Sequence, residues 1–352
     1  MPQPSPSPGS SDSTAALRAR IEAHLTHETG APATVRALSP LPGGACQENY
    51  VVEVTLGAGP LAGDRRLALR SDSKTSLPGS LGRAAEYGVV RAAAGAGVKT
   101  PQAHYLAHGL IREGADAYFL DWIEGDAIGR RVVSHPKLET ARKLLPAQLA
   151  AELARIHSIN PTTHPDLFQS RQDGFSGPDP VESTLALLRR MLDGLGEAHP
   201  ALELGTRWLS DNRPPPGEVT LVHGDFRTGN FMVNEAGLAG ILDWEFSRFS
   251  SPVEDVGWLC VRDWRFGKLD RPAGGFASRA QMAEAYEKAS GRKLTPQLIH
   301  YWEVMGNVRW AAGSLHQGER YLAGDHDIEL IAIARRAVEM EWEALRLIEK
   351  GY

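Results

Sequence analysis

The chain contains 352 residues with a mass of 38.2 kDa, which is long enough to form two lobes or domains with sizeable cores. Hydrophobic residues make up 42% and charged residues 23% of it, as in ordinary soluble globular proteins. The formal net charge of −5 and a pI near 6.2 argue against a general nucleic-acid binder, because no basic excess is present to displace counterions from phosphates.

Cysteine content and hydropathy argue against further classes of protein. The two cysteines, Cys46 and Cys260, lie far apart, which excludes a disulfide framework and argues against a thiolate zinc site. No apolar run of about 18 residues or more occurs, so no membrane-spanning helix is expected. We therefore expect a cytoplasmic protein without a nucleic-acid or membrane partner, and the sequence leaves its oligomeric state open.

The first third of the sequence favours a small sheet. Residues 1–14 are rich in Pro and Ser and are predicted to form a disordered tail, followed by a short amphipathic helix over 15–25. Alternating apolar residues and turns that contain Gly or Pro predict strands within 38–69. This first lobe, assigned to residues 15–122, has a further helical stretch and two further strands, predicted over 83–94, 104–107 and 117–122.

Helical patterns dominate the second lobe, assigned to residues 123–352. Within 147–158, Leu149, Leu153 and Ile156 recur at helical spacing just after Pro146, which is expected to precede this helix. A helix is also expected around 180–195. The C-terminal segment from Asp327 is expected to be a helix, with one face formed by Ile331, Ala334, Val338, Trp342 and Leu345.

The second lobe contains the sequence HGDFRTGN at 223–230 and ILDWE at 241–245. Asp225, Asn230 and Asp243 are the residue types, at suitable intervals, that an enzyme needs to move a phosphoryl group. One carboxylate accepts the hydroxyl proton, while an amide and a second carboxylate hold the magnesium ion that neutralises the phosphates. The pattern therefore predicts magnesium-assisted phosphoryl transfer.

A hairpin is expected to bring the two candidate metal ligands together. Two strands, over 231–233 and 238–242, are expected to be joined by a tight turn. A turn centred between Ala236 and Gly237 sets Asn230 opposite Asp243, so both lie at one end of the hairpin. Asp225 lies in a different loop, where it could act as a general base or orient the acceptor hydroxyl.

Three neighbours of Asp225 have predicted roles of their own. Arg227 is placed where a cation could reach the transferring phosphate, although it could equally be a solvated loop arginine. His223 is interpreted as structural, holding the loop through its ring nitrogens. Gly224 is expected to provide a backbone angle that a side chain would block.

HGDFRTGN with ILDWE resembles the aminoglycoside phosphotransferase (APH) family, a branch of the protein-kinase-like fold. More narrowly, the chain resembles bacterial phosphotransferases akin to the kinase-like domain attached to certain acyl-CoA dehydrogenases, through DWRFG at 263–267 and WEVMGNVRW at 302–310. The resemblance implies a bilobal α+β fold, with a small antiparallel-sheet N-lobe for the nucleotide and a larger helical C-lobe for catalysis and substrate. It also implies an ATP-dependent kinase that uses Mg²⁺ and a small-molecule hydroxyl acceptor.

The same resemblance assigns nucleotide-binding roles in the first lobe. Gly43 and Gly44 match the family's glycine-containing loop over the phosphates. Arg70 stands where such kinases usually carry a lysine that contacts the phosphates, and Glu86 matches the carboxylate partner of that lysine. An arginine could pair bidentately with Glu86 and contact phosphate, but its planar head does not replace lysine freely.

Two further segments gain roles from the resemblance. Residues 120–125 resemble the hinge whose backbone groups hold the adenine, so Asp121 and Ile123 are assigned to nucleotide binding. Asp255 resembles a structural aspartate that braces the catalytic loop.

The acceptor is expected to bind in the helical lobe, near Trp264, Arg265 and Arg309. Arginines mixed with tryptophans suit an anionic or partly apolar acceptor, such as a hydroxyacyl-CoA or a hydroxy acid, better than a polycationic aminoglycoside. The alternative is that the tryptophans belong to the core and the arginines form ordinary ion pairs.

Other functions remain open at this point. A catalytically weak nucleotide-binding module that regulates a partner would account for Arg70 in place of lysine, and a true aminoglycoside phosphotransferase is a further alternative. A metal-dependent hydrolase fits less well, because such sites usually need clustered histidines and the histidines here are dispersed. The sequence decides neither the acceptor nor the choice between ATP and GTP.

Overall fold

The computed structural model describes residues 9–41, 48–73, 79–168 and 179–351, with side chains from residue 14 onward. The chain divides into two compact units, Met1–Arg91 with Pro101–Trp122 and Ala92–Thr100 with Ile123–Tyr352. The sequence had placed residues 92–100 in the first lobe, whereas they pack with the second unit.

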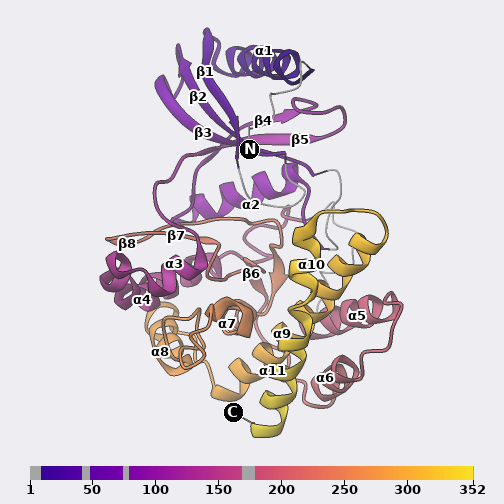
Figure 1. Ribbon diagram of the computed structural model, residues 1–352. Coiled ribbons are helices and arrows are strands. Elements are labelled where there is room, and N and C mark those ends of the chain that lie inside the picture. Colours follow the sequence, from indigo (N-terminus) through magenta and orange to yellow (C-terminus); the bar gives the residue numbers. More distant parts are fainter. Residues whose placement is uncertain (1–8, 42–47, 74–78, 169–178, 352) are drawn as a thin grey trace. The chain divides into compact units, whose positions relative to one another are not determined.

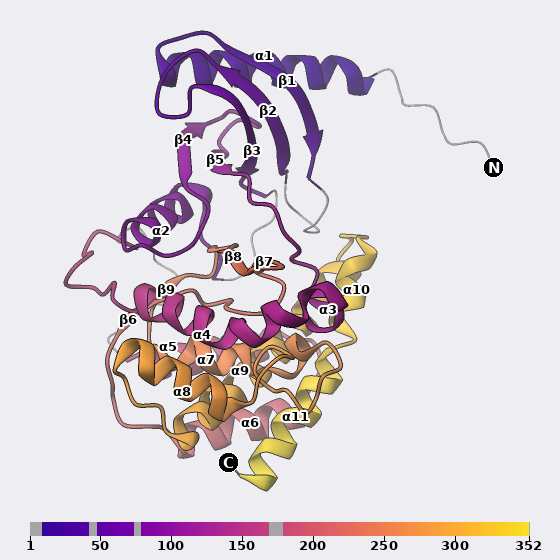
Figure 2. The ribbon, with the colours of Figure 1, turned by 90° about the vertical axis from the view of Figure 1, so that its left-hand side faces the viewer.

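The first unit is a five-stranded antiparallel sheet with the strand order β1-β2-β3-β5-β4. Figures 1 and 2 show α1 lying beside β1. Helix α1 begins at Gly9 rather than at the expected position 15, so residues 9–14 of the expected tail are helical. The elements of this part of the chain are α1 (Gly9–Thr29), β1 (Ala33–Pro40), β2 (Tyr50–Leu56), β3 (Gly63–Ser71), α2 (Arg83–Gly95), β4 (Ala103–His108) and β5 (Asp116–Asp121).

The core of the first unit follows from two sequence periods. Leu17, Ile21 and Leu25 recur every four residues, so they share one face of α1, and all three are buried. Alternate residues of the strands, such as Val52 and Val54 of β2, point to the same side of the sheet. The two sets pack into one hydrophobic cluster that fixes α1 on the sheet.

The second unit is mainly helical. Its helices are α3 (Gly129–Ser134), η1 (Pro136–Leu138), α4 (Glu139–Ile156), α5 (Pro180–Asp193), α6 (Pro200–Asp211), α7 (Val253–Leu259), η2 (Arg262–Arg265), α8 (Arg279–Ser290), α9 (Pro296–Leu322), α10 (Ile328–Ala334) and α11 (Ala337–Lys350). Its strands form two small antiparallel pairs, β6 (Thr220–Val222) with β9 (Arg248–Ser250) and β7 (Phe231–Asn234) with β8 (Gly237–Ile241). A small antiparallel sheet and a mainly helical unit together confirm the predicted α+β class.

Helix α9 organises the second unit, because it packs against α6, α7, α10 and α11 (Figure 1). Its start is encoded locally: the Thr295 hydroxyl accepts a hydrogen bond from the Leu298 amide at 3.2 Å, and Pro296 occupies the first turn. Helix α4 differs from the prediction, because it continues through Pro146. Leu145 and Leu149 are both fully buried, so the apolar face of α4 continues across the proline and holds the helix together.

The C-terminal segment also differs from the prediction. The expected single helix is divided into α10 and α11 by a turn at Arg335 and Arg336. The predicted apolar face is therefore not one buried stripe: Ile331, Val338 and Trp342 are exposed. A different set fills the interior, namely Leu330, Ala337, Met340, Ala344 and Leu347.

Candidate functional site

The loop that carries the HGD sequence leaves β6 and is held by Asp255 at the start of α7. The Asp255 carboxylate accepts from the backbone amides of His223, at 2.8 Å, and Gly224, at 2.9 Å. Gly224 has a φ of +77°, and a Cβ placed there would lie 2.1 Å from the Phe246 carbonyl oxygen. A glycine is therefore required at this position, and Asp255 is a brace of the loop.

Asp255 is itself fixed in a buried network. His157 contacts it through Nε2 at 3.2 Å, and the other ring nitrogen of His157 lies 2.7 Å from the Tyr286 hydroxyl. Burial alone would raise the pKa of Asp255, but the hydrogen bond from His157, the nearby histidines and the His223 amide hold its pKa below the ordinary value. The brace is thus a carboxylate at neutral pH.

His223 links the HGD loop to the ILDWE segment. Its Nδ1 accepts from the Asp225 amide at 3.3 Å, so its Nε2 carries the proton and donates to the Leu242 carbonyl at 3.0 Å. Burial lowers the pKa of His223, and the negative charges of Asp255, Asp225 and Asp243 only partly oppose this effect. The neutral ring is structural, as its position in the loop suggested.

Asp225 is 7% exposed, and its carboxylate accepts from three side chains. The Trp258 indole donates to Oδ1 at 2.7 Å, and the Asn230 amide donates to Oδ2 at 2.7 Å. The Arg227 Nε donates to Oδ1 at 3.0 Å and to Oδ2 at 3.1 Å. The carboxylate is therefore held in one orientation by donors from the loop and from α7.

The β7–β8 hairpin places Asn230 and Asp243 at one end, but in a register that differs from the prediction. Phe231 pairs with Ile241, and the Leu242 amide donates to the Asn230 carbonyl at 2.9 Å. Asn230 therefore faces Leu242, and Asp243 is the next residue. The turn lies one residue earlier than expected, at Glu235 and Ala236.

Asp243 has a left-handed backbone, with a φ of +67°. Such a conformation costs roughly 1–3 kcal/mol for a residue other than glycine and tends to occur at functional sites. The next residue, Trp244, anchors this backbone, because its side chain is buried and its indole donates to the Thr100 hydroxyl at 3.1 Å. Thr100 in turn donates to the Ile241 carbonyl at 2.9 Å, so the end of β8 is tied to residues 92–100.

Arg227 is not a solvated loop arginine. Besides its bonds to Asp225, its guanidinium lies 4.4 Å from the centre of the Trp264 ring. Gly229 makes room for it, because a Cβ at that position would lie 2.6 Å from Arg227 Nη1. The cation is thus held next to the carboxylate, and its contact with phosphate stays a prediction.

Two residues predicted to bind substrate have other tasks. Arg265 is 2% exposed and pairs with Glu303 at 2.8 Å and with Glu343 at 2.9 Å, so it joins η2 to α9 and α11. We therefore correct its assignment: a guanidinium enclosed by two buried carboxylates is part of the packing. Trp264 is also buried, at 3% exposure, beneath Arg227.

Arg309 supports the loop. Its Nη1 pairs with Glu254 at 2.6 Å, and its Nη2 donates to the Gly224 carbonyl at 2.9 Å. Burial lowers the pKa of Arg309 to about 10, so the guanidinium is still charged at neutral pH. We reassign Arg309 from substrate binding to positioning of the HGD loop.

In the first unit, Glu86 is shared between two arginines. Arg70 Nη2 lies 3.5 Å from Glu86 Oε1, and Arg83 Nη1 donates to Oε2 at 2.5 Å. Arg83 also donates to the Ser71 carbonyl at 3.1 Å, which ties α2 to the end of β3. Arg83 was not predicted from the sequence, although its position three residues before Glu86 on a helix indicates a pair.

The remaining nucleotide-binding assignments stay predictions. Asp121 ends β5; its amide donates to the Gln102 carbonyl at 3.1 Å, and its carboxylate lies 3.0 Å from His104 Nε2. Ile123 is the first residue of its segment in the second unit. Gly43 and Gly44 lie outside the described residues.

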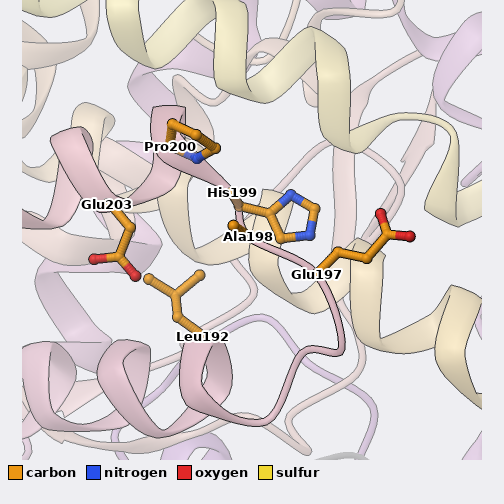
Figure 3. A pocket seen from close by; sticks show the side chains of 6 residues that line it. All are labelled: Leu192, Glu197, Ala198, His199, Pro200 and Glu203. Atoms are coloured by element: carbon orange, nitrogen blue, oxygen red, sulfur yellow. The ribbon is translucent and has the colours of Figure 1, made fainter.

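A surface pocket of about 400 Å³ lies where the chain passes from α5 to α6 (Figure 3). Its lining residues are Leu192, Glu197, Ala198, His199, Pro200 and Glu203. None of them belongs to the Asp225 cluster, so the candidate site is defined by the motif's own geometry. Across the described ranges, no group of three or more His, Cys, Asp or Glu side chains could hold a metal ion, and none of the described helices is long and apolar enough to cross a membrane.

Comparison with known proteins agrees with this fold. The model of the phosphotransferase enzyme family, APH, matches residues 37–292. The chain therefore belongs to the phosphotransferase enzyme family, and the predicted class of enzyme is confirmed at that level.

Two relatives are acyl-CoA dehydrogenase family members. Member 10 of Mus musculus is 32% identical over 203 residues, which cover 56% of this chain and 18% of that protein. Member 11 of Gallus gallus is 28% identical over 259 residues, which cover 69% of this chain and 32% of that protein. The predicted resemblance to this group is confirmed, and the chain spans about a third or less of these relatives.

Solved structures share the fold. A candidate aminoglycoside phosphotransferase from Ralstonia eutropha superposes with a TM-score of 0.68 at 20% identity, covering 93% of this chain and 98% of that one. A thermostable mutant of aminoglycoside phosphotransferase APH(4)-Ia, in ternary complex with AMP-PNP and hygromycin B, gives 0.55 at 15% identity over 93% and 97%. The expected kinase-like architecture is therefore confirmed.

Proposed function

We propose that the chain is an ATP-dependent kinase that transfers the γ-phosphoryl group to a hydroxyl of a small molecule. The observation that carries the proposal is the arrangement of Asp225, Asn230 and Asp243. A buried carboxylate is oriented by three donors, and an amide and a second carboxylate lie at the adjoining end of one hairpin. Phosphoryl transfer needs this division between an acceptor-facing carboxylate and metal-binding oxygens.

The residues fit a magnesium ion. The Asn230 amide nitrogen donates to the Asp225 carbonyl at 3.0 Å and to Asp225 Oδ2 at 2.7 Å, which leaves its Oδ1 as the ligating atom. Together with the Asp243 carboxylate this makes two oxygen ligands, and Mg²⁺ typically takes one or two from protein and the others from phosphates and water. When bound, the ion would neutralise charge on the phosphates.

The role proposed for Asp225 is to accept the proton of the acceptor hydroxyl, or to orient that hydroxyl. Arg227, next to it, would stabilise charge on the transferring group. In the first unit, Arg70 and Glu86 would contribute to binding of the nucleotide phosphates, with Asp121 and Ile123 at the adenine. The proposal gives Trp264 a supporting role beneath Arg227.

For the acceptor, we propose a hydroxyacyl-CoA or a hydroxy acid ahead of an aminoglycoside. The relatives named acyl-CoA dehydrogenase family members support this class of acceptor. Local charge supports it too: Arg227 lies beside the proposed acceptor position, and a polycationic sugar would meet a cation there.

A nucleotide-binding regulatory module is the second candidate, favoured by one observation. Glu86 is held by Arg83 at 2.5 Å and only loosely by Arg70, at 3.5 Å, so the usual pairing of a phosphate-binding lysine with this carboxylate is altered. Such a module would bind ATP without transferring its phosphoryl group.

One assay separates the two candidates. The protein is incubated with ATP, Mg²⁺ and a panel of hydroxyacyl-CoAs, hydroxy acids, amino sugars and aminoglycosides, and ADP formation is followed with and without each acceptor. The kinase proposal predicts ADP formation above background with at least one acceptor, together with a phosphorylated product. Measurable ATP binding with background turnover for every acceptor would favour the regulatory module.

A further inference from the structure

The indole of Trp258 reaches Asp225 from α7. Its Nε1 donates to Asp225 Oδ1 at 2.7 Å, and the side chain is 5% exposed. We propose that Trp258 is a positioning residue that fixes Asp225 for phosphoryl transfer. This inference rests on the proposed kinase function.

The three residues that donate to Asp225 differ in their other proposed roles in the reaction. Asn230 is also a proposed metal ligand and Arg227 a proposed phosphate contact, so both would interact with ligands during the cycle. The Trp258 indole carries only a donor and has no acceptor atom with which to take up a proton. It can therefore hold Oδ1 throughout the reaction, and a hydrogen bond to a charged, buried carboxylate is among the stronger kinds.

The proposed transfer step places the acceptor proton on Asp225. As the acceptor oxygen forms its bond to the γ-phosphorus and the bond from that phosphorus to the bridging oxygen of ATP breaks, the hydroxyl proton passes to Asp225. Asn230 donates to Oδ2 at 2.7 Å and Arg227 to both oxygens, all from the loop itself, whereas the indole donates to Oδ1 at 2.7 Å from α7. The indole, as the donor from outside the loop, therefore fixes the orientation of the carboxylate that receives the proton.

The ring of Trp258 is itself immobilised. The Arg309 guanidinium lies 3.9 Å from its centre, and Arg309 is anchored on Glu254 and on the Gly224 carbonyl. On the side of α9, a Cβ at Gly306 would lie 3.4 Å from Trp258 Cε3. The indole, Arg309 and the HGD loop thus form one rigid unit, which gives the reassigned Arg309 a task at the same carboxylate.

The chain offers a matched control in Trp310. Its indole belongs to the same aromatic cluster, with ring centres 6.4 Å from Trp258, but it donates at 2.8 Å to a different carboxylate, that of Asp263. Trp258→Phe and Trp310→Phe both keep an aromatic ring and remove one indole hydrogen bond to an aspartate. They differ in which aspartate loses its donor.

The kinetic test uses the full chain, ATP, Mg²⁺ and the best acceptor from the panel. For Trp258→Phe we expect kcat to fall about 10-fold to 100-fold, the loss expected from one hydrogen bond to a charged group. Its dissociation constant for ATP should stay within about twofold of the wild-type value, since Trp258 touches no proposed nucleotide contact. Equal losses of kcat in Trp258→Phe and Trp310→Phe would overturn the proposal, because a general packing effect would then explain both.

A second measurement does not depend on turnover. In protein labelled with ¹⁵N at tryptophan, the indole N–H resonance of Trp258 should shift strongly in Asp225→Ala, while that of Trp310 should stay in place. An unmoved Trp258 resonance would show that the hydrogen bond is absent in solution and would overturn the inference. A wild-type protein that turns over no acceptor but shows this shift would instead contradict the proposed function and leave the contact standing.

Discussion

At the scale of single residues, the site is organised around the neutral form of His223 and the charged form of Asp255. The histidine donates a hydrogen bond to the Leu242 carbonyl and accepts one from the Asp225 amide, so it connects the two halves of the motif. The aspartate holds two consecutive amides of the loop. Neither residue touches the proposed acceptor, yet both determine where Asp225 lies.

The protonation of His223 gives a prediction for stability against pH. Because burial lowers its pKa below 6.5, the unfolded chain binds more protons than the folded one as the pH drops below this value. The contribution of His223 is therefore fully present above about pH 6.5 and is lost as the pH falls toward the folded pKa. We expect the free energy of unfolding in urea to fall between about pH 7.5 and 5.5, with His223 contributing to the loss.

His223→Gln isolates this effect, since an amide can also accept and donate but does not titrate. The variant should be less stable than the wild type at neutral pH and should show a weaker loss of stability on acidification. His300, whose pKa is also lowered by burial, remains in both proteins and provides the same background. Identical pH dependence in the two proteins would contradict the role given to His223.

Much of the site was predictable because its signals are local. The predicted hairpin brought Asn230 and Asp243 to one end, and Gly224 was expected to adopt an unusual backbone angle. Trp258 was not predictable, because its contact with Asp225 depends on how α7 packs against α9. The assignment of Arg265 was wrong for the same reason: its carboxylate partners lie on helices distant in the sequence.

At the scale of elements, α7 and α9 approach each other through glycines. A Cβ at Gly257 would lie 2.5 Å from the Cβ of Trp302 and 2.7 Å from its backbone carbonyl carbon. Helix α7 carries both Asp255 and Trp258. The distance between α7 and α9 therefore determines the positions of the HGD loop and of the Trp258 indole.

We therefore expect Gly257→Ala to destabilise the protein by roughly 1–3 kcal/mol through overpacking. The matched control is Gly313→Ala in α9, where the nearest atom would be 3.9 Å away and alanine should stabilise the helix by up to about 1 kcal/mol. Unfolding in urea measures both differences. A Gly257→Ala protein as stable as the wild type would show that α7 and α9 are not in close contact.

The hairpin shows why register is hard to obtain from sequence. The Asn234 side chain accepts a hydrogen bond from the Ala236 amide at 3.0 Å. Such a contact favours a turn at the observed position, one residue before the predicted one. The other cause is tertiary: Gln148 of α4 accepts from the Leu238 amide at 2.8 Å, next to Gly237. An extra residue in β8, Ala239, then restores part of the register.

At the scale of the whole molecule, the proposed tasks are divided between the two units. The first holds Arg70 and Glu86, and the second holds Asp225 and its partners. The fold class and the boundary at Trp122 were accessible from composition, because a sheet-rich segment gives way to helical periodicity. The transfer of residues 92–100 to the second unit was not, since it depends on bonds such as that from Lys99 to the Leu238 carbonyl, at 2.7 Å.

This division predicts that nucleotide affinity and turnover can be lost separately. Arg70→Met should raise the dissociation constant for ATP about 10-fold, because it removes a cation proposed to contact the phosphates. Arg36→Met, which removes an exposed strand arginine paired with Asp64, should leave ATP affinity unchanged. Calorimetric titration with ATP and Mg²⁺ checks both, and equal affinities of the two variants would count against a nucleotide role for Arg70.

Asp225 is proposed to serve the transfer step, and Asp225→Asn is the sharpest test of that role. ADP formation with the best acceptor and ATP affinity are measured in parallel on the wild type, on Asp225→Asn and on the control Asp211→Asn, an exposed aspartate of α6. We expect Asp225→Asn to lower kcat by about 10²-fold to 10⁴-fold while ATP affinity stays near the wild-type value, and Asp211→Asn to change neither. Wild-type turnover in Asp225→Asn would show that Asp225 has no role in the transfer step.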